Sequence, residues 1–411
     1  MPQNLNYHDH FWALDQFLRE HQHLWRPRPF NHLQLEWENL HPELSQWLRQ
    51  RSLEQAEAVH NQPETLAAPA PYTQWAQQSA ELCQIPKAIS LELPTKAEPV
   101  AVPGRKWQQI QAFANSLSFR QKPSHWLDWC AGKGHLGRHL TAPDQALTCL
   151  EYDPTLVAAG QQLSQRQQLH AQHLCQDVFD QSVQQHLAPE ITPVALHACG
   201  DLHTHLLKQA QQQHCQQLAI VPCCYNRIHS SHYQPLSSIA QRSNLQLSRE
   251  DLSLPLSETV TGGTRVRRQR DQSMAWRLGF DALQRELRGL DQYLPTPSLS
   301  AEWLSRSFAD YCRHLAQLKH LSIDSEPDWA ALQAYGHQRL AQVRNLELVR
   351  SLFRRPMELW LLMDQALYLQ EHGYQVQLKE FCEHALSPRN LLLQAEKQAV
   401  DKSVDENLIK P

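Results

Sequence analysis

The chain has 411 residues, which is long for one domain, so two or three units or one domain with a large insertion are expected. Its formal charge of -4 excludes a molecule-wide basic field for nucleic acid, and any such partner would need a local patch. The 10 cysteines lack the regular pairing of a disulfide framework, and no apolar run reaches membrane length, so we expect neither a leader segment nor a membrane span. These features predict a cytoplasmic protein without membrane contact and leave its oligomeric state unknown.

Residues 1–104 have the periodicity of helices, with Phe11, Leu14 and Leu18 recurring at helical spacing. A further helix is predicted from residue 105. Its apolar residues fall on one face, which we expect to pack against a sheet: Trp107, Ile110, Phe113 and Leu117.

Strand-like and helix-like segments then alternate along the chain. The strands are predicted from Trp126 onward and at 146–153, 173–178, 193–202 and 218–226. Alternation of this kind favours a parallel, doubly wound sheet with helices on both faces. A further strand-like segment is predicted at 245–256, followed by helices rich in Leu, Trp and Arg.

Near the end of the chain, an amphipathic helix stops at Gly373, and two strands follow with the sequence SPRN (387–390) between them. A short connection makes these two strands antiparallel. A purely parallel, dehydrogenase-type sheet would not contain such a pair, whereas a class I methyltransferase sheet ends in one.

The predicted fold class is therefore α/β, a Rossmann-like class I methyltransferase sheet with helical additions. Its expected parts are a helical N-terminal region (1–104), a cofactor-binding domain (105–235 plus 355–398), a mainly helical insertion or cap (236–354) and a flexible tail (399–411).

The most informative segment is WLDWCAGKGHLGRHL, at 126–140. It combines a short strand, the acid Asp128, a turn containing Gly132 and Gly134, and the start of a helix. Glycines let such a turn close tightly and let a ligand approach the backbone, and the helix directs unsatisfied N–H groups at the same place. The pattern predicts a nucleotide-type cofactor.

Two cofactors compete for this turn, because Gly132, Gly134 and Gly137 also satisfy the G-x-G-x-x-G pattern of dinucleotide sites. An anion at Asp128 would repel a pyrophosphate but would suit the positive charges of S-adenosylmethionine. Glu151 ends the second strand, where a carboxylate binds ribose hydroxyls. Asp177 ends the third strand, where it can accept a hydrogen bond from an adenine amino group. The sequence favours S-adenosylmethionine, with an NAD(P)-dependent oxidoreductase and a non-catalytic cofactor-binding scaffold as the alternatives.

Four motifs taken together, DWCAGKGHLG, LHACGDL, PCCYN and SPRN, resemble the methyltransferase family that includes methyltransferase-like protein 25 and the glutathione S-transferase C-terminal domain-containing protein. The eukaryotic tRNA 2′-O-methyltransferase of the acceptor stem is similar in its glycine loop, its Cys-Gly and its paired cysteines. The resemblance covers about 105–235 and 355–398. The chain departs from many class I enzymes at Cys130, where they carry a glycine.

The resemblance implies an S-adenosylmethionine-dependent methyltransferase whose cofactor is held by Asp128, Gly132, Gly134, Glu151 and Asp177. The same pocket is predicted to include neighbouring residues at the strand ends: Cys130, Ala131, Tyr152, Asp153, Val178 and His197.

The acceptor is less clearly specified. The chain lacks the Asn/Asp-Pro-Pro-Tyr motif that grips a planar amino group, and HACGDL occupies that position. His197, Asp201 and Tyr225 are the titratable groups best placed to act as base or orienting group. An RNA acceptor, with tRNA ribose as one candidate, or a protein side chain is expected.

Substrate contacts are predicted at the ends of the later strands, in the basic run of the insertion and in the SPRN loop: Cys199, Cys223, Cys224, Asn226, Arg265, Arg267, Arg389 and Asn390. Adjacent cysteines do not easily bind one tetrahedral ion, and no Cys-x-x-Cys spacing occurs among them. No metal site is therefore predicted, and packing of the cysteines is the alternative to a substrate contact.

Overall fold

The computed structural model describes residues 6–90, 102–258 and 263–398, so the predicted tail at 399–411 lies outside the described residues. The chain divides into two compact units. We call Met1–Asp15, Gln84–Leu256 and Glu358–Pro411 the sheet unit, and Gln16–Cys83 and Ser257–Met357 the helical unit.

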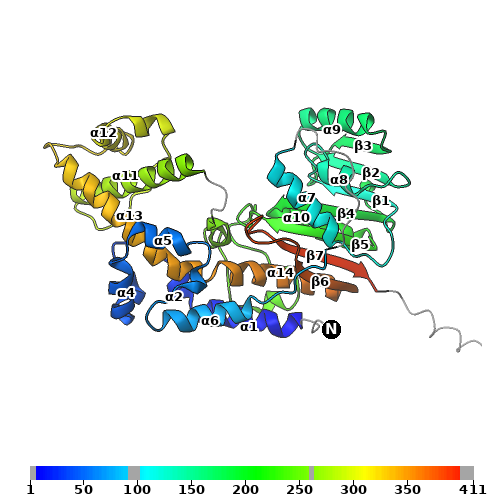
Figure 1. Ribbon diagram of the computed structural model, residues 1–411, viewed down its shortest axis with the longest axis horizontal. Coiled ribbons are helices and arrows are strands. Elements are labelled where there is room, and N and C mark those ends of the chain that lie inside the picture. Colours follow the sequence, from blue (N-terminus) through cyan, green and yellow to red (C-terminus); the bar gives the residue numbers. More distant parts are fainter. Residues whose placement is uncertain (1–5, 91–101, 259–262, 399–411) are drawn as a thin grey trace, which may run out of the picture. The chain divides into compact units, whose positions relative to one another are not determined.

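The sheet unit contains one seven-stranded sheet, which lies across the middle of this unit in Figure 1. Its strands are β1 (His125–Trp129), β2 (Ala146–Glu151), β3 (Ala171–Cys175), β4 (Ile191–Cys199), β5 (Gln217–Cys223), β6 (Tyr374–Glu380) and β7 (Leu391–Lys397). Their order is β3-β2-β1-β4-β5-β7-β6.

Strands β1 to β5 pair in parallel, and β7 pairs antiparallel with both β5 and β6. The predicted fold class is confirmed, including the closing antiparallel pair. Because β6 runs in the same direction as β5, the loop after β6 lies at the edge of the sheet where β1 to β5 also end. This edge collects the predicted site residues of the sheet unit.

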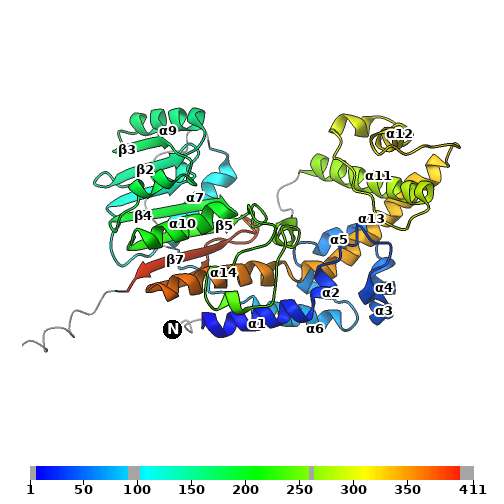
Figure 2. The same ribbon diagram turned by 180° about the vertical axis from the view of Figure 1, so that it is seen from behind.

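Helices cover both faces of this sheet, as the two opposite views show (Figures 1 and 2). The helical elements of the sheet unit are α7 (Gly104–Ser116), α8 (His135–Leu140), α9 (Pro154–Arg166), η2 (Gln181–His186), α10 (Asp201–Gln212), η3 (Ala240–Arg242), η4 (Asp251–Ser257) and parts of α1 (Tyr7–Glu20) and α14 (Arg354–Glu371). The strand order reverses direction between β1 and β4. Right-handed crossovers therefore place α8 and α9 on one face and α10 on the other.

The predicted apolar face of α7 forms part of the core. Ile110 and Phe113 are fully buried against Trp126, Leu147 and Val194 from the sheet, with Trp107 and Leu117 packed at the margin of this cluster. This burial fixes α7 beside β1 and brings its polar residues to the edge of the sheet where the parallel strands end.

The predicted strand at 245–256 is wrong. The segment makes only an isolated bridge at Ser248 and then forms the 3-10 helix η4. The Ser248 N–H donates to Asp251 Oδ2 (2.9 Å), and the Asp251 N–H donates to Ser248 Oγ (3.1 Å). This reciprocal pair favours a helix start over strand pairing.

The helical unit is built from two segments that are far apart in the sequence. Its elements are α2 (Gln22–Trp25), α3 (Glu36–Leu40), α4 (Pro42–Arg49), α5 (Leu53–Val59), η1 (Pro63–Thr65), α6 (Tyr72–Leu82), α11 (Thr264–Arg288), η5 (Ala301–Ser305), α12 (Phe308–Leu318) and α13 (Trp329–Ser351). Phe30 and Leu53 pack against Leu278, Leu340 and Val343. N-terminal helices and helices of the insertion thus share one core. None of the described helices is long and apolar enough to cross a membrane.

Candidate active site

The glycine turn connects β1 to α8 through three residues with left-handed backbone: Cys130 (φ 55°), Gly132 (φ 58°) and Gly134 (φ 69°). Backbone hydrogen bonds hold its shape, since the Ala131 N–H donates to the Leu150 carbonyl (2.9 Å) and the Gly134 N–H donates to the Ala131 carbonyl (2.8 Å). The predicted turn is therefore anchored to the neighbouring strand β2.

Gly132 and Gly134 have different surroundings. A Cβ atom added at Gly134 would lie 2.5 Å from His173 Cε1 and 2.9 Å from Cys149 Sγ, so this glycine is required by close packing. A Cβ atom added at Gly132 would meet nothing within 4 Å. Gly132 therefore borders open space, as a residue beside a ligand should.

Asp128 is buried, and its Oδ2 accepts a hydrogen bond from the Gly137 N–H (2.8 Å) in the first turns of α8. Burial, together with the negative charge of Glu151, raises the pKa of the Asp128 carboxyl to about 6. A buried carboxylate gains from a nearby cation. Asp128 thus both positions α8 and favours a positively charged ligand.

Glu151, the last residue of β2, faces the glycine turn. Its Oε2 accepts from the Gly132 N–H (2.8 Å), and its Oε1 accepts from the Asp153 N–H (3.0 Å). A carboxylate offers about four acceptor positions. Two are used by the backbone here, which leaves acceptor capacity for a pair of ligand hydroxyls.

The remaining residues of the predicted cofactor pocket follow β2 and β3. Tyr152 is 73% exposed, and Asp153 caps α9 by accepting from the Thr155 N–H (2.8 Å). Strand β3 ends at Cys175, so Asp177 follows the strand and does not end it as predicted. Asp177 Oδ1 accepts from the Phe179 N–H (2.9 Å), a turn that stops the strand early, and Val178 is buried. Asp153 therefore has a structural role that explains its presence, and Asp177 fixes the turn after β3.

His197 lies near the end of β4 with an unusual backbone conformation (φ 66°) at a register shift between β4 and β5. Its Nε2 is 3.0 Å from Gln109 Oε1, and Gln109 Nε2 donates to the Leu386 carbonyl (3.1 Å). An amide oxygen only accepts, so Nε2 carries the proton and Nδ1 is the acceptor nitrogen of the ring. Burial and the charges of Lys106 and Arg389 lower the pKa of His197 to about 4.

Asp201 begins α10. Its Oδ2 accepts from both the His229 N–H (2.7 Å) and His229 Nδ1 (2.8 Å), which ties α10 to the loop after β5. Tyr225 is buried and donates its hydroxyl to Glu358 Oε1 (3.1 Å). Burial and the negative charge of Glu358 raise the pKa of Tyr225 well above its ordinary value.

The loop between β6 and β7 reaches the same edge of the sheet. Arg389 donates to the Pro255 carbonyl, and its positive charge acts on His197 and Cys224. The buried Asn390 donates from Nδ2 to the Cys382 carbonyl (2.8 Å), which closes the loop on itself.

The other predicted substrate residues lie in two different places. Arg265 and Arg267 are exposed near the start of α11, in the helical unit, whereas Asn226 is half-buried in the loop after β5 in the sheet unit. The structure thus divides the predicted substrate residues between the two units.

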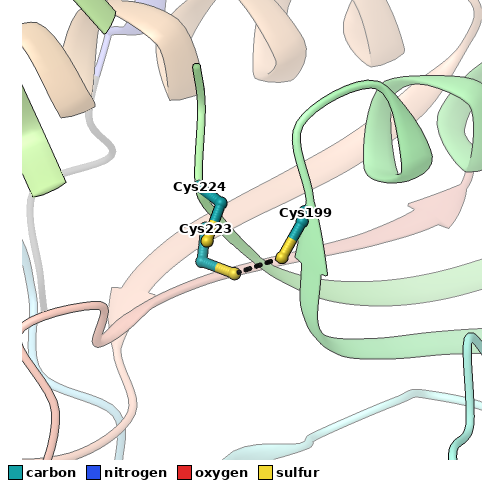
Figure 3. A group of neighbouring side chains, drawn as sticks. All are labelled: Cys199, Cys223 and Cys224. Carbon is teal, nitrogen blue, oxygen red and sulfur yellow. Dashed lines mark hydrogen bonds between the residues drawn. The ribbon is translucent and has the colours of Figure 1, made fainter. Parts of the chain in front are cut away.

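Three predicted residues, Cys199, Cys223 and Cys224, come together at the ends of β4 and β5 (Figure 3). The Sγ atoms of Cys199 and Cys223 are 3.5 Å apart. Hydrogen bonds from Cys199 and Cys223, with the charges of Arg227 and Arg389, lower the pKa of the Cys224 thiol.

Three residues that contact or act on the predicted site residues were not expected from the sequence: Gln109, Lys106 and Glu358. Gln109 and Lys106 lie on the polar side of α7 and look there like ordinary solvated residues. Glu358 lies in α14, more than a hundred residues from the Tyr225 that it contacts. No local pattern marks any of the three, because their roles arise from contacts between distant segments.

Residues 105–231 match a protein-family model described as a methyltransferase domain. The chain therefore contains a methyltransferase domain, an enzyme domain whose methyl donor is S-adenosylmethionine, and the predictions of enzyme class and cofactor are confirmed at this level.

Similar solved structures include a SAM-dependent methyltransferase from Agrobacterium tumefaciens (15% identity, 36% of this chain and 55% of that chain, TM-score 0.24). A 23S rRNA methyltransferase, ErmE, is 13% identical over 58% of this chain and 97% of that chain (TM-score 0.23). Coclaurine N-methyltransferase bound to N-methylheliamine and SAH is 13% identical over 84% of this chain and 91% of that chain (TM-score 0.28). This chain spans about half of the Agrobacterium protein, and at these TM-scores none of the three indicates a substrate for it.

Proposed function

We propose that this protein is an S-adenosylmethionine-dependent methyltransferase that modifies RNA, with a ribose hydroxyl as the favoured acceptor. The observation that carries the cofactor assignment is the set of carboxylates at or just beyond three successive strand ends, Asp128, Glu151 and Asp177, around a glycine turn. The four sequence motifs further suggest the family of methyltransferase-like protein 25, and a cytoplasmic location stays a prediction.

The residues of the turn fit this cofactor. Open space at Gly132 accommodates its methionine portion, and the two unused acceptor positions of Glu151 accommodate the ribose hydroxyls. Asp128 would stabilise the positive charge, and Asp177 would accept from the adenine amino group. When bound, S-adenosylmethionine supplies an activated methyl group, so holding the acceptor in line is the main task left to the protein.

His197 is the residue we propose to orient the acceptor. Gln109 fixes the ring through Nε2, which leaves Nδ1 to accept a hydrogen bond from an acceptor hydroxyl. Asp201 is held by His229 at the start of α10 and would orient the same substrate. Tyr225 is better suited to a positioning role, because its buried hydroxyl is directed at Glu358.

RNA is favoured as the acceptor because exposed arginines gather at the start of α11. Arg265 and Arg267 are exposed and can therefore contact phosphate groups, which contribute binding affinity but do not report the base sequence. They supply the local patch that a chain of net charge -4 needs for an anionic partner.

Labelled methyl transfer tests the proposal. The purified protein is incubated with methyl-labelled cofactor and extract from cells that lack it, and the products are treated separately with ribonuclease and protease. Label released only by ribonuclease supports the proposal, whereas label released only by protease replaces RNA with a protein acceptor. Cofactor binding without any transfer would indicate a scaffold.

Two binding measurements separate the remaining alternatives. Calorimetry with S-adenosylhomocysteine and with NADH distinguishes a methyltransferase from an oxidoreductase, and binding of NADH alone would contradict the proposal. Replacement of Arg265 and Arg267 by Ala should weaken RNA binding and reduce the salt slope by about 1 to 2. The control replaces Arg306 and Arg313, which are also exposed but are paired with Glu302 and Glu326.

A further inference from the structure

Three thiols meet where two parallel strands end, at a place the proposed function does not use. Cys199 is the last residue of β4, Cys223 is the last of β5, and the two are register partners. Cys224 follows directly. All three Sγ atoms lie within 4.8 Å of one another, as the close view illustrates (Figure 3).

The convergence of Cys223 and Cys224 has a clear backbone cause. Consecutive residues of a regular strand point to opposite faces, which is why the sequence argues against joint ligation. Strand β5 ends at Cys223, however, and Cys224 has a left-handed backbone (φ 45°). That conformation turns its side chain back to the side of Cys223.

A left-handed conformation is strained for a residue other than glycine. It persists only where the surroundings impose it, and it is concentrated at functional sites. Packing of a small apolar side chain does not require it, since Cys224 is only half-buried. A ligand bound by the three sulfurs would explain why this strained conformation is kept, because it requires Cys224 to point toward the other two thiols.

The spacing of the sulfurs matches metal coordination. In a tetrahedral site with Zn–S bonds of about 2.3 Å, two sulfurs lie about 3.8 Å apart. The observed separations, 3.5 Å between Cys199 and Cys223 and at most 4.8 Å within the group, require only small side-chain movements. Two of the thiols are half-buried and Cys223 is buried, so an ion can enter and is then partly shielded from water.

The charges around the cluster also suit a thiolate site. Arg227 and Arg389 are the cationic groups that act on Cys224, and Arg227 also acts on Cys199. They offset part of the negative charge that three thiolates and a divalent ion would carry together. Among the described residues, these three cysteines are the group of potential ligands whose donor atoms come together in this way.

We propose that Cys199, Cys223 and Cys224 bind one Zn²⁺ ion through three thiolates, with the fourth position open to water or to an acceptor group. Each thiol releases its proton to solvent on binding, and no oxidation or reduction occurs. Three protein ligands with one open position are the usual arrangement of catalytic rather than structural zinc. This inference does not depend on the proposed methyl transfer.

Cobalt substitution tests the site directly. The full-length chain, reduced and freed of metal, is titrated with Co²⁺, whose thiolate-to-metal charge-transfer band reports sulfur ligands, and with Zn²⁺ in competition. We expect one equivalent of Co²⁺ with a thiolate band, displaced by Zn²⁺. Cys224→Ser should weaken binding at least tenfold, whereas Cys175→Ser, which removes an exposed thiol at the end of β3, should leave it unchanged.

Other outcomes overturn the proposal. Failure of the wild-type chain to bind Co²⁺ would do so whether or not the Ser variants fold, and circular dichroism checks their folding. Equal loss in Cys224→Ser and Cys175→Ser would place the metal elsewhere. A Cys199–Cys223 disulfide found by mass spectrometry in a chain that binds no metal when reduced would make the cluster a redox pair instead.

Discussion

The two central glycines of the turn after β1 should respond differently to the same substitution. Both have positive φ, so alanine at either position costs about 1–2 kcal/mol of folding free energy. At Gly134 the new methyl group would also lie 2.5 Å from His173 and 2.9 Å from Cys149, and such overpacking adds about 1–3 kcal/mol. Gly134→Ala should therefore destabilise the protein by about 2–5 kcal/mol and Gly132→Ala by only about 1–2 kcal/mol.

Ligand binding should show the opposite order. The methyl group of Gly132→Ala occupies the space assigned to the cofactor, so affinity for S-adenosylhomocysteine should fall at least tenfold, or about 1.4 kcal/mol. Unfolding in urea, followed by circular dichroism without ligand, gives the first comparison, and calorimetry gives the second. Equal destabilisation by both variants, or full affinity in Gly132→Ala, would refute the reasoning.

Three further predictions concern acids and their partners. The pKa of Asp128 is about 6 in the folded state against about 3.9 unfolded, so the folded state binds this proton more tightly. The stability of wild type relative to Asp128→Asn should therefore fall by about 3 kcal/mol as pH rises from about 3 to 7. A flat difference between the two in urea titrations would contradict the burial argument. Glu151→Gln leaves one acceptor oxygen for two backbone donors, so the affinity for S-adenosylhomocysteine measured by calorimetry should fall more than tenfold. Unchanged affinity would show that Glu151 does not belong to the cofactor site. Tyr225→Phe removes a hydrogen-bond donor to the buried Glu358, so thermal unfolding should show that the folding free energy falls by about 1–3 kcal/mol, while methyl transfer falls only a few-fold. Abolished transfer in a stable variant would instead assign Tyr225 a catalytic role.

Local patterns determined most of the α/β architecture. Alternation of apolar strands with helices predicts the parallel sheet, because burial on both faces requires continuous apolar strands. The short SPRN connection predicts the antiparallel β6–β7 pair that the sheet contains. The sequence also predicts that Asp128, Glu151 and Asp177 lie near one another. The reason is that parallel strands all end at one edge of the sheet, so residues at successive strand ends are neighbours in space.

Tertiary structure alone decided the details that depend on distant segments. The segment 245–256 has the pattern of a strand but forms a 3-10 helix, because Ser248 and Asp251 hydrogen-bond to each other. At Cys224 a left-handed backbone places its side chain on the same side as that of Cys223, although adjacent residues of a strand normally point to opposite faces. The Gln109–His197 contact joins residues 88 positions apart, which no periodicity reports. The helical unit likewise combines 16–83 with 257–357, because an apolar helix face can be covered by any complementary face in the chain, and the sequence does not state which one.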